Sequence, residues 1–398
     1  MKGEGTALVT AAGGRSPHKD MVKLRRALSA LVVSGASVSL AVFVTWTFVT
    51  GGANPFVKAQ PTPIPVPTKH LNLQGGVIVP RWGQDAYGAV DHGYVKALSE
   101  IQQQTGANWV EVTFTLYQQD ITSTQVYRGE SSTSPENLGA GIAAARAAGY
   151  HIYVVPALTL ESTDWAGLID FSTHQSAQKW FDNYELALAP YLQAAAQAGA
   201  DQFSIGNELD NLDKHWPDLW NQLLDRVHAT FPGALTYNFN FNSAYSLPYP
   251  WMTNPHLTYL GVSEYQSLVD DPTKRLSVSQ MESVWQVSIL PQLDRISAQS
   301  GKQILISEIG YRNATDALYQ PWVHSTRAPE DATLQAAAYE AAMIEVYSDP
   351  HFAGIFFWAW SVPPFAPNWQ PASRVLRAWY ANDKQPPPCN ALLPLLQC

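Results

Sequence analysis

The sequence predicts an α/β protein built as a (β/α)8 barrel, preceded by a transmembrane helix and a proline-rich linker. One observation is the composition of the 398-residue chain, which is 46% hydrophobic, only 14% charged and rich in Trp, Tyr and Phe. Disordered chains are rich in charge and poor in aromatic residues, so this composition indicates a folded protein. The other two observations are a repeated pattern of amphipathic run, glycine and short apolar strand, and one long uncharged segment near the start.

The uncharged segment predicts the transmembrane helix. No charged residue occurs from Ala27 to Asn54, and residues 27–50 exceed the roughly 20 residues that cross a bilayer core. Four Lys and Arg residues come just before the segment, which places residues 1–26 in the cytoplasm. A cleaved signal peptide is the alternative, but the apolar part of such a peptide usually spans about 7–15 residues. We therefore expect a cell-membrane protein with an extracellular body, or a secreted protein if the segment is cleaved.

Residues 51–69 form the predicted linker, in which prolines alternate with other residues. Alternating prolines favour an extended polyproline conformation, which is typical of a stalk between a membrane and a domain. The C-terminal tail, residues 383–398, holds both cysteines of the chain, Cys389 and Cys398. Exported proteins form disulfides, so these two cysteines are either paired with each other or free thiols.

The barrel itself is expected over residues 70–382. Helical runs end at Gly106, Gly149 and Gly199, and each is followed by a short apolar run of the kind found in buried parallel strands. Eight strands with crossover segments between them are typical of a (β/α)8 barrel. A doubly wound sheet is the alternative, but the sequence has no glycine-rich phosphate loop. The expected strands cover residues 75–79, 108–114, 151–156, 202–206, 235–240, 259–264, 303–308 and 354–360.

Charge and motif content exclude several classes of function. The first 59 residues hold seven Lys or Arg and two acidic residues, which gives them a net charge of +5. Because the net charge of the whole chain is −9, the other 339 residues carry a net charge of −14. Duplex-binding proteins need a basic surface, and no nucleic-acid partner is expected. The ten histidines include no H-E-x-x-H motif, so neither a metal nor another cofactor is expected. We expect a monomer whose partners are a saccharide and, through the N-terminal helix, a membrane.

The C-terminal ends of the strands are where such barrels carry their chemistry. Glycoside cleavage requires one carboxylic acid that protonates the leaving oxygen and one carboxylate that attacks or stabilises the anomeric carbon. Two carboxylates on strands at opposite sides of the mouth meet this requirement, and Trp rings offer flat apolar faces to sugars. The residues at the strand ends are Asn207, Glu208, Glu264, Tyr265, Glu308, Trp358 and Trp360.

The order and spacing of these motifs resemble the clan-A glycoside hydrolases, and most of residues 70–380 resembles the family-113 β-mannanases. Such enzymes retain the anomeric configuration of the sugar. The stretches that carry the resemblance are Phe203–Leu209, Leu235–Asn238, Gly261–Tyr265, Ser307–Tyr311, Pro321-Trp322 with Gln335, and Gly354–Trp358.

The resemblance implies a role for five residues at the mouth. Glu208 would be the general acid/base and Glu308 the nucleophile. Asn207 would bond the 2-hydroxyl of the sugar, Tyr265 would hold the nucleophile's carboxylate, and Trp358 would form the floor beneath the cleaved sugar. We thus expect a retaining glycoside hydrolase that cleaves a β-linked polysaccharide, β-1,4-mannan first. The alternatives are another clan-A activity, such as a β-1,4-glucanase, or a non-catalytic carbohydrate-binding barrel.

Other residues near the strand ends have two open interpretations. Trp82 follows the first strand and is a candidate sugar platform, and Trp360 is expected to face the same side as Trp358. Glu264 either contacts the substrate or has a structural role, whereas Glu111 is expected to be a polar group of the core. Five further tryptophans either line outer parts of the groove or pack in the core, namely Trp165, Trp216, Trp251, Trp322 and Trp369.

Overall fold

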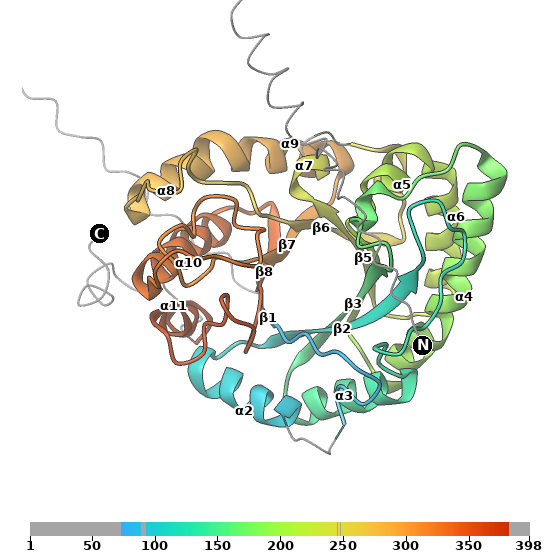
Figure 1. Cartoon of the computed structure of the whole chain (residues 1–398), viewed down its shortest axis with the longest axis horizontal. Coiled ribbons are helices and arrows are strands. Elements are labelled where there is room, and N and C mark those ends of the chain that lie inside the picture. The colour runs from blue at the N-terminus through green and yellow to red at the C-terminus, as the bar shows by residue number, and fades with distance from the viewer. Residues whose placement is uncertain (1–72, 89–92, 245, 247, 382–398) are drawn as a thin grey trace, which may run out of the picture. The chain divides into compact units, whose positions relative to one another are not determined.

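The computed structural model of the chain describes residues 73–88, 93–244, 246 and 248–381 (Figure 1). The predicted transmembrane segment, the linker and the C-terminal tail with its two cysteines lie outside these residues. Within the described ranges, no helix is both long and apolar enough to span a membrane.

Eight parallel strands form a closed barrel, in which each strand pairs with the next in sequence and β8 pairs with β1. This arrangement confirms the predicted (β/α)8 fold. Strand β8 ends three residues earlier than the sequence pattern predicts, which matters for Trp360 below. The strands are β1 Gln74–Ile78, β2 Trp109–Gln118, β3 His151–Leu160, β4 Gln202–Asn207, β5 Ala234–Asn240, β6 Leu257–Ser263, β7 Gln303–Ile309 and β8 Phe352–Phe357.

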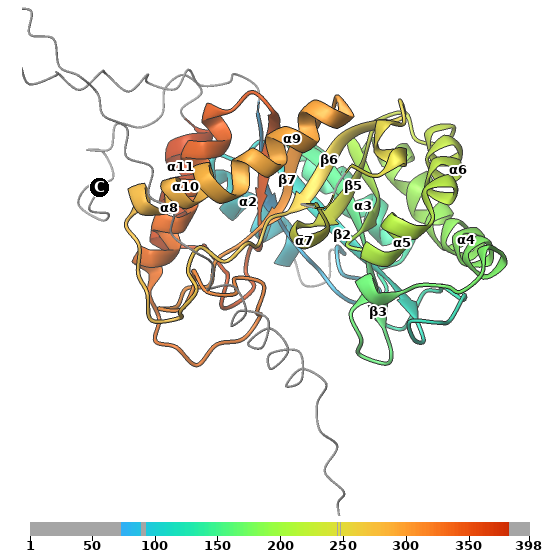
Figure 2. The same ribbon diagram turned by 90° about the horizontal axis from the view of Figure 1, so that it is seen from above.

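Helices surround the barrel on its outside (Figures 1 and 2). The longer ones run between consecutive strands, and a π-helical turn, η3, joins α8 to α9. The helices are α2 Gly93–Thr105, α3 Pro135–Ala147, η1 Ala166–Leu168, α4 His174–Ala198, α5 Asp210–His215, α6 Pro217–His228, α7 Phe241–Ala244, η2 Pro250–Thr253, α8 Val278–Val284, η3 Trp285–Ile289, α9 Leu290–Ser300, α10 Ala332–Ser348 and α11 Pro371–Tyr380.

Local sequence explains where the helices begin and end. The Ser134 side chain caps α3 by accepting a hydrogen bond from the Asn137 N–H, and Thr173 caps α4 in the same way. Such caps satisfy backbone N–H groups that have no partner within the helix. Gly199 ends α4 with φ of 78°, a left-handed conformation that glycine adopts without strain. Gly106, Gly149 and Gly199 all have positive φ and follow the ends of helices, as the sequence predicts, and a strand begins soon after each of them.

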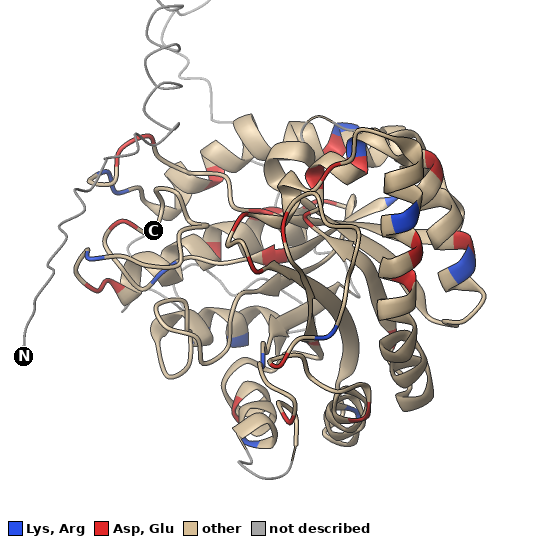
Figure 3. Cartoon of the chain, turned by 45° about the vertical axis from the view of Figure 1, so that its right-hand side comes forward, with Lys and Arg blue, Asp and Glu red and all other residues tan. Residues whose placement is uncertain are grey.

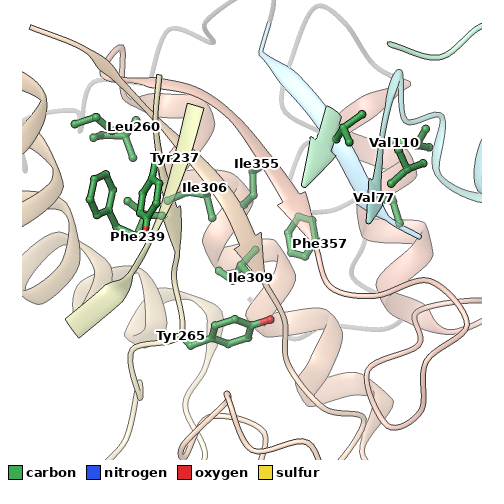
Figure 4. Packing of buried hydrophobic residues seen from close by; sticks show 14 of the residues in the cluster. Val77, Val110, Tyr237, Phe239, Leu260, Tyr265, Ile306, Ile309, Ile355 and Phe357 are labelled. Atoms are coloured by element: carbon green, nitrogen blue, oxygen red, sulfur yellow. The ribbon is translucent and has the colours of Figure 1, made fainter. Parts of the chain in front are cut away.

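In β1, β3, β7 and β8 the buried apolar residues are divided between two clusters of the core. The larger layer lies between the strands and the helices and includes Ile306, Ile355 and Phe357 (Figure 4). Their neighbours in sequence belong to a smaller cluster that fills the inside of the barrel, with Leu305 and Phe356 among its members. The barrel interior is therefore packed with side chains, and any ligand site must lie at a rim.

Gly76 in β1 is required by this interior packing. A Cβ atom at this position would lie 2.1 Å from the ring of Phe356. We predict that Gly76→Ala lowers the free energy of unfolding by about 1–3 kcal/mol, because the added methyl forces a buried ring out of place. Gly139→Ala in α3 is the matched control, since its Cβ would have 3.8 Å to the nearest atom and alanine favours the helix. Urea unfolding of both variants measures the effect, and equal stabilities would contradict the prediction.

Candidate active site

The two predicted catalytic carboxylates line one cavity at the C-terminal ends of the strands. This central cavity has a volume of about 340 Å³. Glu208 directly follows β4, and Glu308 lies near the end of β7. Acidic residues are visible in the middle of the barrel as well as on the surrounding helices (Figure 3). The residues that line the central cavity are Trp165, Glu208, Asn240, Phe241, Asn242, Tyr265, Glu308, Trp322, His324 and Phe365.

The backbone holds Glu208 in an uncommon conformation. Its φ is +53°, a left-handed value that a residue with a side chain rarely adopts and that is often found at functional sites. The conformation is fixed because the Glu208 N–H donates to the Asn238 carbonyl at 2.8 Å, and the next N–H, of Leu209, donates to the Tyr237 hydroxyl at 2.9 Å. The turn therefore aims the carboxyl of Glu208 into the cavity instead of continuing the strand.

Burial raises the pKa of Glu208, because a buried carboxylate loses its hydration. The polar side chains of Ser263, Asn240 and Trp165 oppose this shift, since they favour the ionised form. Two of these three side chains, those of Asn240 and Trp165, also line the cavity. A raised pKa favours the protonated form of Glu208, which is the form that a general acid needs.

Glu308 is held by Tyr265, whose hydroxyl donates to Oε1 at 2.7 Å. Tyr265 lies past the end of β6, beyond Ile309 in the packed layer (Figure 4). Burial, and then the charge of Glu208, raise the pKa of Glu308 to about 8, and the hydrogen bond from Tyr265 opposes them. Each carboxylate disfavours ionisation of the other, and the hydrogen bond from Tyr265 favours the state in which Glu308 is ionised and Glu208 holds the proton. One acid and one carboxylate in one cavity form the pair that glycoside cleavage needs.

Asn207 and Glu264 flank this pair. Asn207 lines a second cavity of about 420 Å³, which shares Glu208 and Trp165 with the central one. Its side-chain oxygen is buried and has no hydrogen-bond partner among the described residues. Glu264 is buried, its carboxylate accepts from the Gln266 N–H at 3.0 Å and its own N–H donates to the Glu308 carbonyl at 2.7 Å. These contacts favour the structural interpretation of Glu264.

The three tryptophans predicted as sugar contacts are placed differently. Trp358 is half-buried and meets the His324 ring edge-on, with 6.2 Å between ring centroids, so it lies directly behind the cavity wall. Trp82 is 58% exposed on the loop after β1 and is not among the residues that line the central cavity. Trp360 is 0% exposed in the larger core layer and has no surface to offer a sugar. The expectation for Trp360 is wrong because β8 ends at Phe357, and strand alternation does not extend to it.

The structure distinguishes between the two interpretations of several tryptophans, and it adds cavity residues that the sequence did not single out. Trp165 and Trp322, for which core packing was one of two interpretations, line the cavity and are 43% and 42% exposed. Trp251 instead lies in the core. The residues that sequence reasoning missed are Asn240, Phe241, Asn242, His324 and Phe365. The first three directly end or follow β5, so their position at a strand end was a usable signal.

Glu111 fits its expected place as a polar group of the core. It is buried in β2, burial raises its pKa well above the usual range, and the charge of Glu308 adds to the effect.

The described residues also include one group with the spacing of metal ligands, Asp294, Asp349 and His351. His351 directly precedes β8, so this group lies at the opposite end of the strands from the two catalytic candidates.

Comparisons with known proteins agree with this geometry. The model of Glycoside Hydrolase Family 113 matches residues 89–373, well over half of the chain. A solved GH113 β-1,4-mannanase complex is 20% identical over 79% of this chain and 100% of its own, with a TM-score of 0.65. The GH113 β-mannanase of Alicyclobacillus acidocaldarius is 19% identical, and the match covers 79% of this chain and 98% of the mannanase with a TM-score of 0.65. A family 5 mannosidase of Rhizomucor miehei is 12% identical, and the match covers 83% of this chain and 95% of the mannosidase with a TM-score of 0.52.

At these identities the structural matches establish the shared barrel fold. No curated protein sequence matches the chain.

The raised pKa of Glu308 makes a prediction about stability. A carboxyl whose pKa is higher in the folded than in the unfolded chain binds more protons when folded, so stability falls as pH rises from about 4.5 towards 8. Glu308→Gln removes this titration. We therefore expect the variant to be more stable than the parent at pH 8, on the order of a few kcal/mol, and to lose less stability between pH 5 and 8.

Thermal melts between pH 5 and 8 measure this effect. Glu130→Gln, at an exposed glutamate, is the control and should follow the parent. If Glu308→Gln and the parent lost stability in parallel, Glu308 would have an ordinary pKa and the electrostatic account of the pair would fail.

Proposed function

The chain belongs to glycoside hydrolase family 113, and we propose that it is a retaining hydrolase of a β-linked polysaccharide, β-1,4-mannan first. The observation that carries this proposal is that Glu208 and Glu308 line one cavity, with the Tyr265 hydroxyl bonded to Glu308. A protein that only binds sugars has no use for two carboxyls whose pKa values are raised in one cavity.

The proposed reaction has two steps. Glu308 attacks the anomeric carbon while Glu208 gives its proton to the departing glycosidic oxygen, so a glycosyl ester on Glu308 forms as the glycosidic bond breaks. Glu208, now a carboxylate, takes a proton from water, which attacks the same carbon and releases Glu308. Tyr265 supports the first step, because its hydrogen bond favours the ionised form of Glu308.

The shape of the mouth supports a chain-like neutral substrate. The second cavity shares Trp165 and Glu208 with the central one, and a third cavity of about 680 Å³ shares Trp322 with it. Three adjoining cavities provide room for several sugars in a row, with exposed tryptophans at the two junctions. The acidic body is a poor surface for a polyanion. The solved relatives are described as β-mannanases, which makes mannan the first substrate to test.

The proposed function predicts the behaviour of two variants. We expect the protein to release reducing ends from β-1,4-mannan, and Glu308→Gln and Glu208→Gln to lower kcat by roughly 10³-fold or more, because each removes one half of the acid and nucleophile pair. Glu130→Gln should keep full activity. The measurement is reducing-sugar release from a panel of mannan, glucan, xylan and galactan, with the anomer of the first product read by NMR.

The panel also separates the alternatives. Activity on glucan in place of mannan would make the protein a β-glucanase. An inverted first product would rule out the double displacement. Binding without release from any polymer would favour a carbohydrate-binding barrel, and full activity of Glu308→Gln would refute the site.

We further propose that the chain is a monomer anchored in the cell membrane by residues 27–50, with the barrel outside the cell. A monomer suffices because both carboxylates and every residue that lines the cavity belong to one chain. The chain enters the barrel at Gln74, the N-terminal end of β1, whereas the cavity lies at the C-terminal ends.

The anchor makes a separate prediction. We expect the full chain to sediment with membranes and to need detergent for release, because an uncharged segment of this length is stable in a bilayer. Replacing two apolar residues of the segment, Val44→Arg and Val49→Arg, should release the protein into the soluble fraction without loss of polysaccharide hydrolysis. Parent protein found in the soluble fraction with residues 1–50 intact would contradict the anchor.

A further inference from the structure

Arg312 is a buried cation just after β7, four residues beyond Glu308. Its side chain is 2% exposed, an unusual position for an arginine unless every donor has a partner. The nearest carboxylate is that of Asp316, and the closest approach of the two charged groups is 3.4 Å. That distance is long for an ion pair, so the carboxylate alone does not account for the buried charge.

Backbone carbonyls satisfy the guanidinium. A guanidinium has five N–H donors in a planar fork. Nη1 donates to the carbonyls of Gln320 and Val323 at 2.9 Å each, and Nη2 donates to those of Asp316 and Tyr319 at 2.9 and 3.0 Å. The remaining donor, Nε, points to the Asp316 carboxylate at 3.4 Å. The loop backbone therefore winds around one cation.

All four carbonyls belong to the loop between β7 and α10, residues 310–331. Loops of this length without regular structure are commonly functional. The carbonyls of Gln320 and Val323 lie on either side of the dipeptide that contains Trp322, and Gln320 has a left-handed φ of 46°. Fixing the chain on both sides of Trp322 fixes the direction in which its indole leaves the loop. Arg312 is the group that makes both bonds.

The loop forms one wall of the central cavity. Trp322 and His324 both line it, and Trp322 packs against Phe241 from across the mouth with 5.6 Å between ring centroids. Trp322 also lines the third cavity. Burial, and then the charge of Arg312, lower the pKa of His324, which favours its neutral imidazole. The position of the wall determines whether the central and third cavities form one groove.

We propose that Arg312 is a positioning residue for sugar binding, whose guanidinium holds the β7–α10 loop so that Trp322 forms the wall shared by the central and third cavities and His324 lines the central one. Arg312 lies outside the set of residues that line either cavity, so it acts through the loop. The role depends on the planar fork of the guanidinium and not on the positive charge alone, because a lysine ammonium has three N–H donors in place of five and cannot serve all four carbonyls.

The first arm of the test needs no ligand. In Arg312→Lys, hydrogen exchange of backbone amides in residues 313–328 should accelerate by about tenfold or more, because local opening of the loop becomes more frequent. Exchange elsewhere in the barrel and the melting temperature should change little. Arg226→Lys on α6, whose arginine is a half-exposed partner of Glu185, is the matched control. Unchanged exchange of the loop in Arg312→Lys would overturn the proposal.

The second arm rests on the proposed function and uses β-1,4-mannohexaose and cellohexaose as probes. In a Glu308→Gln background, which prevents turnover, Arg312→Lys and Trp322→Ala should each weaken binding by about tenfold, and the double variant no more than Trp322→Ala alone. In the active enzyme, KM should rise while kcat stays within about twofold. Losses that multiply in the double variant, or a fall in kcat with KM unchanged, would contradict positioning through Trp322.

The two arms also separate the two proposals. If neither oligosaccharide binds the parent, the assignment to mannan or glucan fails, and the exchange of residues 313–328 alone decides whether Arg312 holds the loop.

Discussion

Closure of a parallel barrel is the constraint on which the rest of the structure depends. When β8 pairs with β1, every strand finds partners on both sides, and the C-terminal ends of all eight strands meet at one rim. Side chains fill the interior, so the rim is where a ligand can enter. Glu208 from β4 and Glu308 from β7 are brought to one cavity by this closure alone, although a hundred residues separate them in sequence. No local feature of either strand could do so.

The chemistry and the stability of this rim oppose each other. Burial raises the pKa of both carboxyls, and Asp210, just after Glu208, has a pKa raised to about 7 by burial and by the charge of Glu208. Each of these groups would be more stable hydrated, and the backbone of Glu208 is held in a conformation that non-glycine residues avoid. The well-packed layers on both sides of the strands supply the stability that such a rim lacks. A site that must keep one proton at neutral pH cannot also be optimised for stability at that pH.

Sequence alone could predict the strands and the residues that end them, because a buried parallel strand is recognisable as a short apolar run after a helix-stopping glycine. Glu208, Tyr265 and Glu308 were found in this way, and the bond between the last two confirms that they lie together. The prediction for Trp360 is wrong because it assumes that the alternation of a strand continues past Phe357, where β8 ends. His324 and Phe365 could not be found at all, since they lie on loops whose paths depend on contacts with distant residues and not on local periodicity.

Two loops at the mouth of the barrel are each held in place by one charged side chain. On the β7 side, a buried guanidinium gathers loop carbonyls around Trp322. On the β3 side, the loop that carries Trp165 is tied down by Asp170, whose carboxylate accepts from the Trp216 indole at 3.1 Å and meets the His215 ring at 2.8 Å. In both cases one charged side chain fixes an irregular segment, and the tryptophan of that segment lines the cavity that holds the two carboxylates. The strands therefore determine which bond can be broken. The loops that these charged side chains hold shape the cavity around the two glutamates.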